Sequence, residues 1–132
     1  MNSAFSEYVL YEPMLRILTA QGYSVECEFA LENDAPGDHP RIDFVASHET
    51  HGKIAIEVKW KKDQNINVDN DCGKLITYSD RNADSHVFLC VFGTQGNIAG
   101  WDCNQPRFEE FGDPAYADMV QTKYGCRMFW LT

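Results

Sequence analysis

Two carboxylates and one lysine near the middle of the chain have the types and spacing to do chemistry: Asp43, Glu57 and Lys59. They lie in two short apolar segments, residues 41–47 and 53–60, that are typical of strands. Successive side chains of a strand point to opposite faces, so Glu57 and Lys59 share a face of the second segment. If the two strands pair with the matching faces together, the three side chains converge.

Carboxylate oxygens suit a hard ion such as Mg²⁺, which keeps several waters for a reaction. Such an ion lowers the pKa of a bound water and neutralises charge that develops on a phosphate. A neighbouring lysine can hold the water or stabilise the transition state. The alternative is a cross-strand salt bridge on a solvated face, and an isolated E-x-K pattern is usually that.

The elements that would position these residues follow from periodicity. Residues 4–20 predict a helix, in which Pro13 either introduces a kink or marks a new start. Strands are expected at 23–31, 41–47, 53–60 and 85–92, and a helix capped by Asp69 or Asn70 runs to about residue 80. After Gly93, residues 114–123 predict a helix and 126–131 a closing strand. The fold class is α/β, a mixed central sheet with flanking helices.

The segments 42–45 and 56–59, with fourteen positions from Asp43 to Glu57, resemble the PD-(D/E)XK nuclease superfamily. The similarity is greatest to its archaeal Holliday-junction resolvase and Mrr-like branches, and it covers about residues 7–92. The resemblance implies a restriction-endonuclease-like αβββαβ core within a single domain, residues 1–132. That core would span about 4–92, followed by an extension, 93–132. It also implies that Glu12, Asp43 and Glu57 bind the metal and that Lys59 assists catalysis.

The chain departs from the family pattern in three places. Pro40 is separated from the aspartate by two residues, so a literal "PD" is absent. Glu12 is followed by proline, which keeps Glu7 as a substitute ligand. Lys74 and Tyr78 resemble the Q-x-x-x-Y helix motif of RecB-like nucleases with lysine in place of glutamine; they either support the site or DNA, or are a surface lysine and a core tyrosine.

The formal net charge of −9 argues against tight binding to nucleic acid. The bases are unevenly distributed, however: residues 51–92 carry six acids and six bases, whereas residues 1–50 carry nine acids and two bases. Lys61, Lys62 and Lys74 are therefore candidate DNA contacts, and the expected binding is weak and salt-sensitive. A minimal core has little surface to grip a duplex, so a homodimer or a larger protein complex is also expected.

The five cysteines form no CxxC pair, which favours buried free thiols over a zinc site or disulfides. The chain has neither a signal-peptide pattern nor an apolar run long enough to span a bilayer, so a cytoplasmic location without membrane association is expected. His48 and His51 are interpreted as residues of a solvated turn rather than zinc ligands, and Trp60, Trp101 and Trp130 as core anchors rather than base-stacking platforms.

The sequence thus predicts an enzyme, a Mg²⁺- or Mn²⁺-dependent endonuclease that hydrolyses DNA phosphodiester bonds. The alternative is a nuclease-fold binding or regulatory module that acts through a protein partner.

Overall fold

The structure is a computed structural model that describes residues 3–32, 36–37, 39–63, 66–118 and 122–132, with only the backbone for residues 3–8 and 118. Within these ranges the helices are α1 (Ser3–Ala20), α2 (Asp69–Arg81) and α3 (Gln95–Ile98). The strands are β1 (Ser24–Ala30), β2 (Arg41–His48), β3 (Gly52–Lys61), β4 (His86–Thr94), β5 (Phe108–Glu110), β6 (Ala115–Asp118) and β7 (Lys123–Leu131).

The strands form one mixed sheet in the order β1-β2-β3-β4-β7-β5, with β6 also paired to β7. All described strand pairs are antiparallel except β3 with β4. Parallel strands need a crossover connection, and α2 lies within the one that joins β3 to β4. The carboxyl ends of β3 and β4 therefore lie at the same edge of the sheet.

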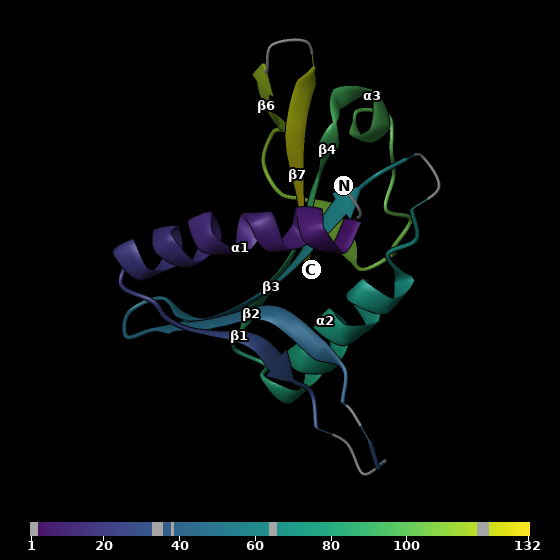
Figure 1. Cartoon of the computed structure of the whole chain (residues 1–132). Coiled ribbons are helices and arrows are strands. Elements are labelled where there is room, and N and C mark those ends of the chain that lie inside the picture. Colours follow the sequence, from purple (N-terminus) through teal and green to yellow (C-terminus); the bar gives the residue numbers. More distant parts are fainter. Residues whose placement is uncertain (1–2, 33–35, 38, 64–65, 119–121) are drawn as a thin grey trace.

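Helices α1 and α2 cover opposite faces of the sheet (Figure 1). Leu10, Met14 and Leu18 of α1 pack on one face, against side chains such as Phe44 and Val58. On the other face the buried residues of α2 are Cys72, Leu75 and Tyr78, which join a core with Ala55, Val87, Leu89 and Val91. Strand β4 contributes alternate residues to both cores, which explains its almost wholly apolar sequence.

The predicted helix, three strands, helix and strand all form, within one or two residues of the expected bounds. Helix α1 continues through Pro13. Neither Asp69 nor Asn70 caps α2, because the N-cap position is Val68 and carries no side-chain hydrogen bond.

The prediction of a helix at 114–123 is wrong where the structure can test it. Residues 115–118 form β6, whose residues pair with β7 from Ala115–Cys126 to Asp118–Lys123, and residues 119–121 lie outside the described residues. The predicted closing strand is correct and forms the greater part of β7. The expected extension after residue 92 thus adds three strands to the same sheet.

Of the five cysteines, Cys72, Cys90 and Cys103 are buried, Cys126 is half-buried and Cys27 is exposed. No helix in the described part of the chain is long and apolar enough to cross a membrane.

Candidate active site

Strands β2 and β3 are joined by two carboxylates at the point where their register ends. The paired register runs from His48–Gly52 to Phe44–Ile56. Beyond it, the backbone N–H of Asp43 donates to Glu57 Oε1 at 2.9 Å, and the backbone N–H of Val58 donates to Asp43 Oδ2 at 2.7 Å. The two side chains thus replace backbone hydrogen bonds between the strands, and each is held by the strand that carries the other.

Helix α1 adds Tyr11 to this pair. The Tyr11 hydroxyl contacts Asp43 Oδ1 at hydrogen-bond distance and also lies 3.0 Å from Glu28 Oε1. A phenol has a single proton, so it serves one of these carboxylates at a time. Glu28 has a positive φ of 54°, and it interrupts the register of β1 with β2 between Cys27 and Phe29. This local distortion accompanies the approach of a third carboxylate to the site.

Helix α2 supplies the cation. Lys74 Nζ lies 2.9 Å from Glu57 Oε2 and donates to the backbone carbonyl of Arg41 at 2.8 Å. The Glu57 side chain is only 3% exposed and that of Lys74 is 23% exposed. Because Lys74 also lies 3.9 Å from Asp71, its charge is shared between two acids. We call the group Tyr11, Asp43, Glu57 and Lys74 the carboxylate seam.

The seam holds more negative charge than its burial favours. Burial raises the pKa of Glu57 to about 8, and the nearby Asp43 carboxylate adds to the rise, although Lys74 opposes it. Burial also raises the pKa of Asp43 against the hydrogen bonds from Tyr11 and Val58. Burial alone would lower the pKa of Lys74, but Glu57 and Asp71 outweigh it and the pKa is raised. Binding of a proton or a cation by the two acids would therefore offset the free-energy cost of burying their negative charge.

Lys59 lies on the same face of β3 as Glu57, but its ammonium is directed to another acid. Its Nζ is 3.6 Å from Asp71 Oδ2, and the side chain is 29% exposed. Asp71 thus lies between Lys59 and Lys74, near enough to both to couple them. The prediction that Asp43 and Glu57 come together is confirmed, whereas Lys59 stands beside the pair with Asp71 as its partner.

Glu12 does not join the cluster. Its side chain is 73% exposed and pairs with Arg16 one turn along α1. The residues of α1 that face the sheet are Leu10, Tyr11, Met14 and Leu18, and a step of one residue turns Glu12 away from them by about 100°. Tyr11 therefore occupies the position that the sequence assigned to Glu12. The side chain of Glu7, the proposed substitute, lies outside the described residues.

The lysines predicted to contact DNA have three different environments. Lys61 is 1% exposed, donates to the backbone carbonyl of Asp63, and has its Nζ 5.9 Å from the centre of the Trp101 ring. Burial lowers the pKa of Lys61, which Asp63 partly opposes. Lys61 is therefore not an exposed phosphate contact. Lys62 is exposed, whereas Lys74 belongs to the carboxylate seam.

The structure also distinguishes between the alternatives given for Lys74, Tyr78 and His48. Lys74 supports the acids, while Tyr78 is a core residue at 2% exposure. His48 is a turn residue, since its Nδ1 accepts hydrogen bonds from the backbone N–H groups of Thr50 and His51.

Sequence reasoning missed the roles of Tyr11 and Asp71. Asp71 had a usable signal, because it stands three residues before Lys74 and so shares its helix face. Tyr11 had a weaker one, since it lies one and three residues from Leu10 and Met14 on the face of α1 that packs on the sheet. Glu28 approaches the site from β1, where its positive φ interrupts the register with β2 opposite Asp43.

The donor set suits a hard divalent cation. Asp43 and Glu57 offer four carboxylate oxygens, and Mg²⁺ is usually held by one or two carboxylates together with water. No group of three or more His, Cys, Asp or Glu side chains is gathered for a metal within the described ranges. All four oxygens already accept a hydrogen bond or ion pair from the chain, so an ion would compete with these contacts, and with the positive charge of Lys74 above all.

Comparison of the chain with models of known protein families, with curated proteins and with solved structures finds no match.

Proposed function

We propose that this chain is a metal-dependent nuclease of the PD-(D/E)XK type, which hydrolyses DNA phosphodiester bonds. The observation that carries the proposal is the reciprocal hydrogen bonding of Asp43 and Glu57 across β2 and β3, with Lys74 already neutralising one of them. A buried acid, Glu57, beside a half-buried one, Asp43, costs stability, and a divalent cation would offset that cost. The order helix, three strands, helix and strand is also the order of the αβββαβ nuclease core.

Asp43 and Glu57 would hold the Mg²⁺ or Mn²⁺ ion, which supplies there a lower pKa for its bound water and neutralises charge on the phosphate. Tyr11 keeps the Asp43 carboxylate oriented through its hydroxyl. Lys74 occupies Glu57 Oε2 while no other cation is bound, so it protects the buried acid from being an unpaired charge. Asp71, 3.9 Å from the Lys74 ammonium, would remain as its partner when Glu57 holds the ion.

Lys59 is the residue we assign to the reacting phosphate. Its ammonium is partly exposed and held 3.6 Å from Asp71, a distance loose enough for it to turn toward a bound substrate. There it would donate hydrogen bonds from Nζ to a phosphate oxygen or to the attacking water, where negative charge develops. DNA would be held weakly and in a salt-sensitive manner, because few exposed lysines lie nearby on an acidic protein.

A second candidate function is a binding or regulatory module that keeps the nuclease fold without turnover. The observation that favours it is the complete internal satisfaction of the acids: each oxygen of Asp43 and Glu57 has a partner in the chain. In that case Lys74 would be a permanent counter-ion and the seam a structural network.

A DNA cleavage assay on wild type and single variants distinguishes the nuclease from the binding module. Supercoiled plasmid and a branched DNA are incubated with Mg²⁺ or Mn²⁺ and wild-type protein, Asp43→Asn or Asp113→Asn. Asp113 is an exposed aspartate in the segment between β5 and β6, so its variant is the matched control. The nuclease proposal expects cleavage by wild type and by the control, and a loss of at least a hundredfold in Asp43→Asn. No cleavage by wild type with either metal would reject the nuclease proposal and favour the module.

A further inference from the structure

A second site lies at the carboxyl ends of the parallel strands β3 and β4, in a pocket of about 730 Å³. Its walls are the end of β3 at Lys61, the segment 66–69 that leads into α2, and the segment 96–104 that begins within α3. Crevices at the carboxyl ends of strands in open α/β sheets are common ligand sites, and this volume is within the range for small ligands. None of the residues that line it belongs to the carboxylate seam.

The walls are tied together by hydrogen bonds, so the pocket is built without a ligand. Asn97 Nδ2 donates to the carbonyl of Lys62 at 3.1 Å, which links α3 to the chain after β3. On the opposite side, Gln105 Nε2 donates to Asp69 Oδ1 at 2.7 Å. Gly93 allows α3 to pack closely, because a Cβ there would lie 3.1 Å from Ile98 Cγ2 of α3 and 2.8 Å from the carbonyl oxygen of Lys61 in β3.

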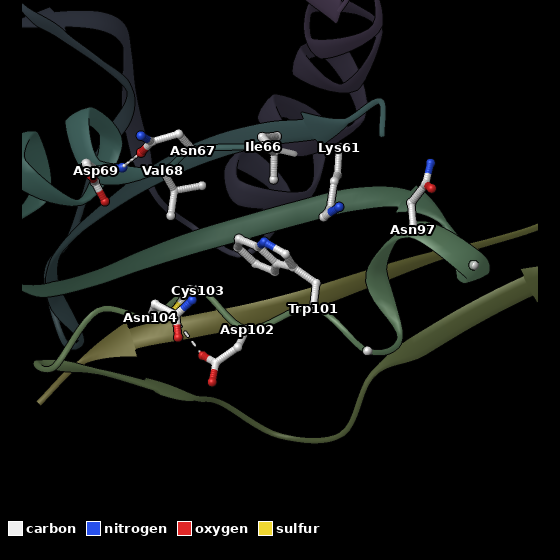
Figure 2. Close-up of a pocket in the computed structure, with 12 residues that line it drawn as sticks. Lys61, Ile66, Asn67, Val68, Asp69, Asn97, Trp101, Asp102, Cys103 and Asn104 are labelled. Atoms are coloured by element: carbon white, nitrogen blue, oxygen red, sulfur yellow. Dashed lines mark hydrogen bonds between the residues drawn. The ribbon is translucent and has the colours of Figure 1, made fainter. Parts of the chain in front are cut away.

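The backbone around Trp101 is fixed by Arg127. The Arg127 guanidinium donates to the carbonyls of Ile98 and Trp101, and Glu110 fixes it through two hydrogen bonds of 3.0 and 2.8 Å. Figure 2 shows the indole among the lining residues, with Lys61 and Asn97 on one side and Asn67 and Asp69 on the other. Trp101 is half-buried, so its ring is available to the pocket as well as to the core.

The amides of the pocket present a donor and an acceptor in fixed orientations. Asn67 Oδ1 accepts from the backbone N–H of Asp69 at 2.8 Å, which leaves the Asn67 amide nitrogen as the end for a ligand. Asn97 uses its nitrogen on Lys62, which leaves its oxygen. Asn104 contributes a third exposed amide. Asp69 and Asp102 also line the pocket and outnumber the one lysine there, Lys61, so the charge of the lining disfavours an anion such as phosphate.

We propose that this pocket binds one unpaired nucleobase through Trp101 and the amides of Asn67, Asn97 and Asn104. A base is neutral, planar and edged with both donors and acceptors, which suits stacking on indole and pairing with asparagine. The inference deepens the proposed nuclease function and rests on it. Glu57 and Lys61 lie on the same face of β3 four residues apart, about 13 Å along the strand, so a single strand cleaved at the seam can reach the pocket within a few nucleotides.

The test measures binding of labelled oligonucleotides by anisotropy at low salt, with Ca²⁺ to prevent turnover. One eight-nucleotide single strand carries adenine at every position and its partner is abasic throughout. The adenine strand is expected to bind about tenfold tighter to wild type. Trp101→Leu and Asn104→Gly are expected to remove that preference. Trp130→Leu, whose ring packs against Phe111 instead, is the control that keeps it.

Two variants are used because Trp101 also packs edge-on against Phe129, so its loss costs stability. Asn104 is exposed and has a positive φ of 54°, a conformation that glycine adopts readily, so Asn104→Gly preserves the fold. Equal binding of the adenine and abasic strands by wild type would overturn the proposal. Retention of the preference for the adenine strand by both single variants, Asn104→Gly and Trp101→Leu, would also overturn it.

Free adenosine and a short neutral oligosaccharide complete the design. Competition by adenosine supports base recognition and identifies a free nucleoside as a sufficient ligand, whereas competition only by an unlabelled strand supports the strand as the source. Displacement by the oligosaccharide but not by adenosine overturns the proposal in favour of a sugar site. Glu57→Gln keeps the adenine preference even if it loses cleavage, so failure of the nuclease and failure of the pocket give different patterns.

Discussion

The carboxylate seam and the pocket at Trp101 lie along the same face of β3 and differ in how their polar groups are used. Glu57 is 2% exposed, and its carboxylate is consumed by contacts to Asp43 and Lys74. Asn67 and Asn104 are exposed, and their internal hydrogen bonds shape loops around an open volume. A ligand of the seam therefore competes with hydrogen bonds and an ion pair that already exist. The pocket, in contrast, is an open volume before any ligand binds. Substitutions should separate charge effects at the first from shape effects at the second.

The largest expected effect is on catalysis at the seam. Lys59→Ala should reduce the rate of DNA cleavage by about 100- to 1000-fold, as expected when one donor to developing charge is lost. Because Lys59 contacts Asp71 and not the two acids, divalent-ion binding should remain largely intact. Single-turnover cleavage beside a thermal shift with Mn²⁺ measures both. If Lys59→Ala cleaves as fast as wild type, the assigned role is wrong.

At the pocket, we expect a larger side chain, rather than a change of charge, to disturb the packing of α3. In Gly93→Ala the new methyl group would lie 2.8 Å from a backbone oxygen and 3.1 Å from Ile98 Cγ2, so α3 must shift. We expect a loss of about 1–3 kcal/mol in the free energy of unfolding, typical of overpacking. Gly96→Ala is the matched control, since the space around its Cβ is open, and alanine is the better helix former. Urea denaturation of both variants decides the matter; similar stability of the two would contradict the close packing.

Removing the Lys74 ammonium should change both the stability of the protein and its affinity for a divalent ion. Lys74→Gln leaves Glu57 without its ion pair, so the metal-free protein should be less stable. The same substitution removes a competing positive charge, so Mn²⁺ should bind about tenfold more tightly, near 1.4 kcal/mol. Lys53→Gln, an exposed lysine of β3, is the control. Titration calorimetry gives the affinities, and weaker binding by Lys74→Gln would show that Lys74 does not compete with the ion.

A smaller effect is expected from pH. The pKa of Glu57 is about 8 in the folded chain and near 4.5 when it is unperturbed, so the folded state holds the extra proton between these values. Stability of the metal-free protein should therefore fall as pH rises through this window, by about 1 kcal/mol or more, which lowers Tm by roughly 4 °C. Glu57→Gln cannot titrate and should flatten the dependence. An identical pH profile in wild type and Glu57→Gln would contradict the raised pKa.

The sequence predicted those parts of the molecule that depend on local patterns. Alternation in residues 41–47 and 53–60 brought Asp43 and Glu57 together correctly, because both strands have one clear apolar face. Helix periodicity also located α2 to within one or two residues. The same reasoning failed at 114–123, where pairing with β7 outweighs helical propensity in a short segment.

The partners of the acids were harder to predict because they depend on tertiary packing. Glu12 was chosen over Tyr11 from its charge, whereas the phase of α1 on the sheet decides which of the two neighbours faces Asp43. The pocket was not predicted at all. Its walls come from residues 66–69 and 96–104, which are separated in sequence and have no periodic pattern, and they meet only because β3 and β4 are parallel.

The central claim is that Asp43 and Glu57 form a site for a divalent cation. Titration calorimetry of the metal-free wild-type protein with Mn²⁺, with Asp43→Asn in parallel, tests it most directly. The account predicts one bound ion per chain in wild type, with proton release near pH 7 as Glu57 ionises, and no binding at this site in Asp43→Asn. Absence of binding in wild type, or equal binding in Asp43→Asn, would contradict it.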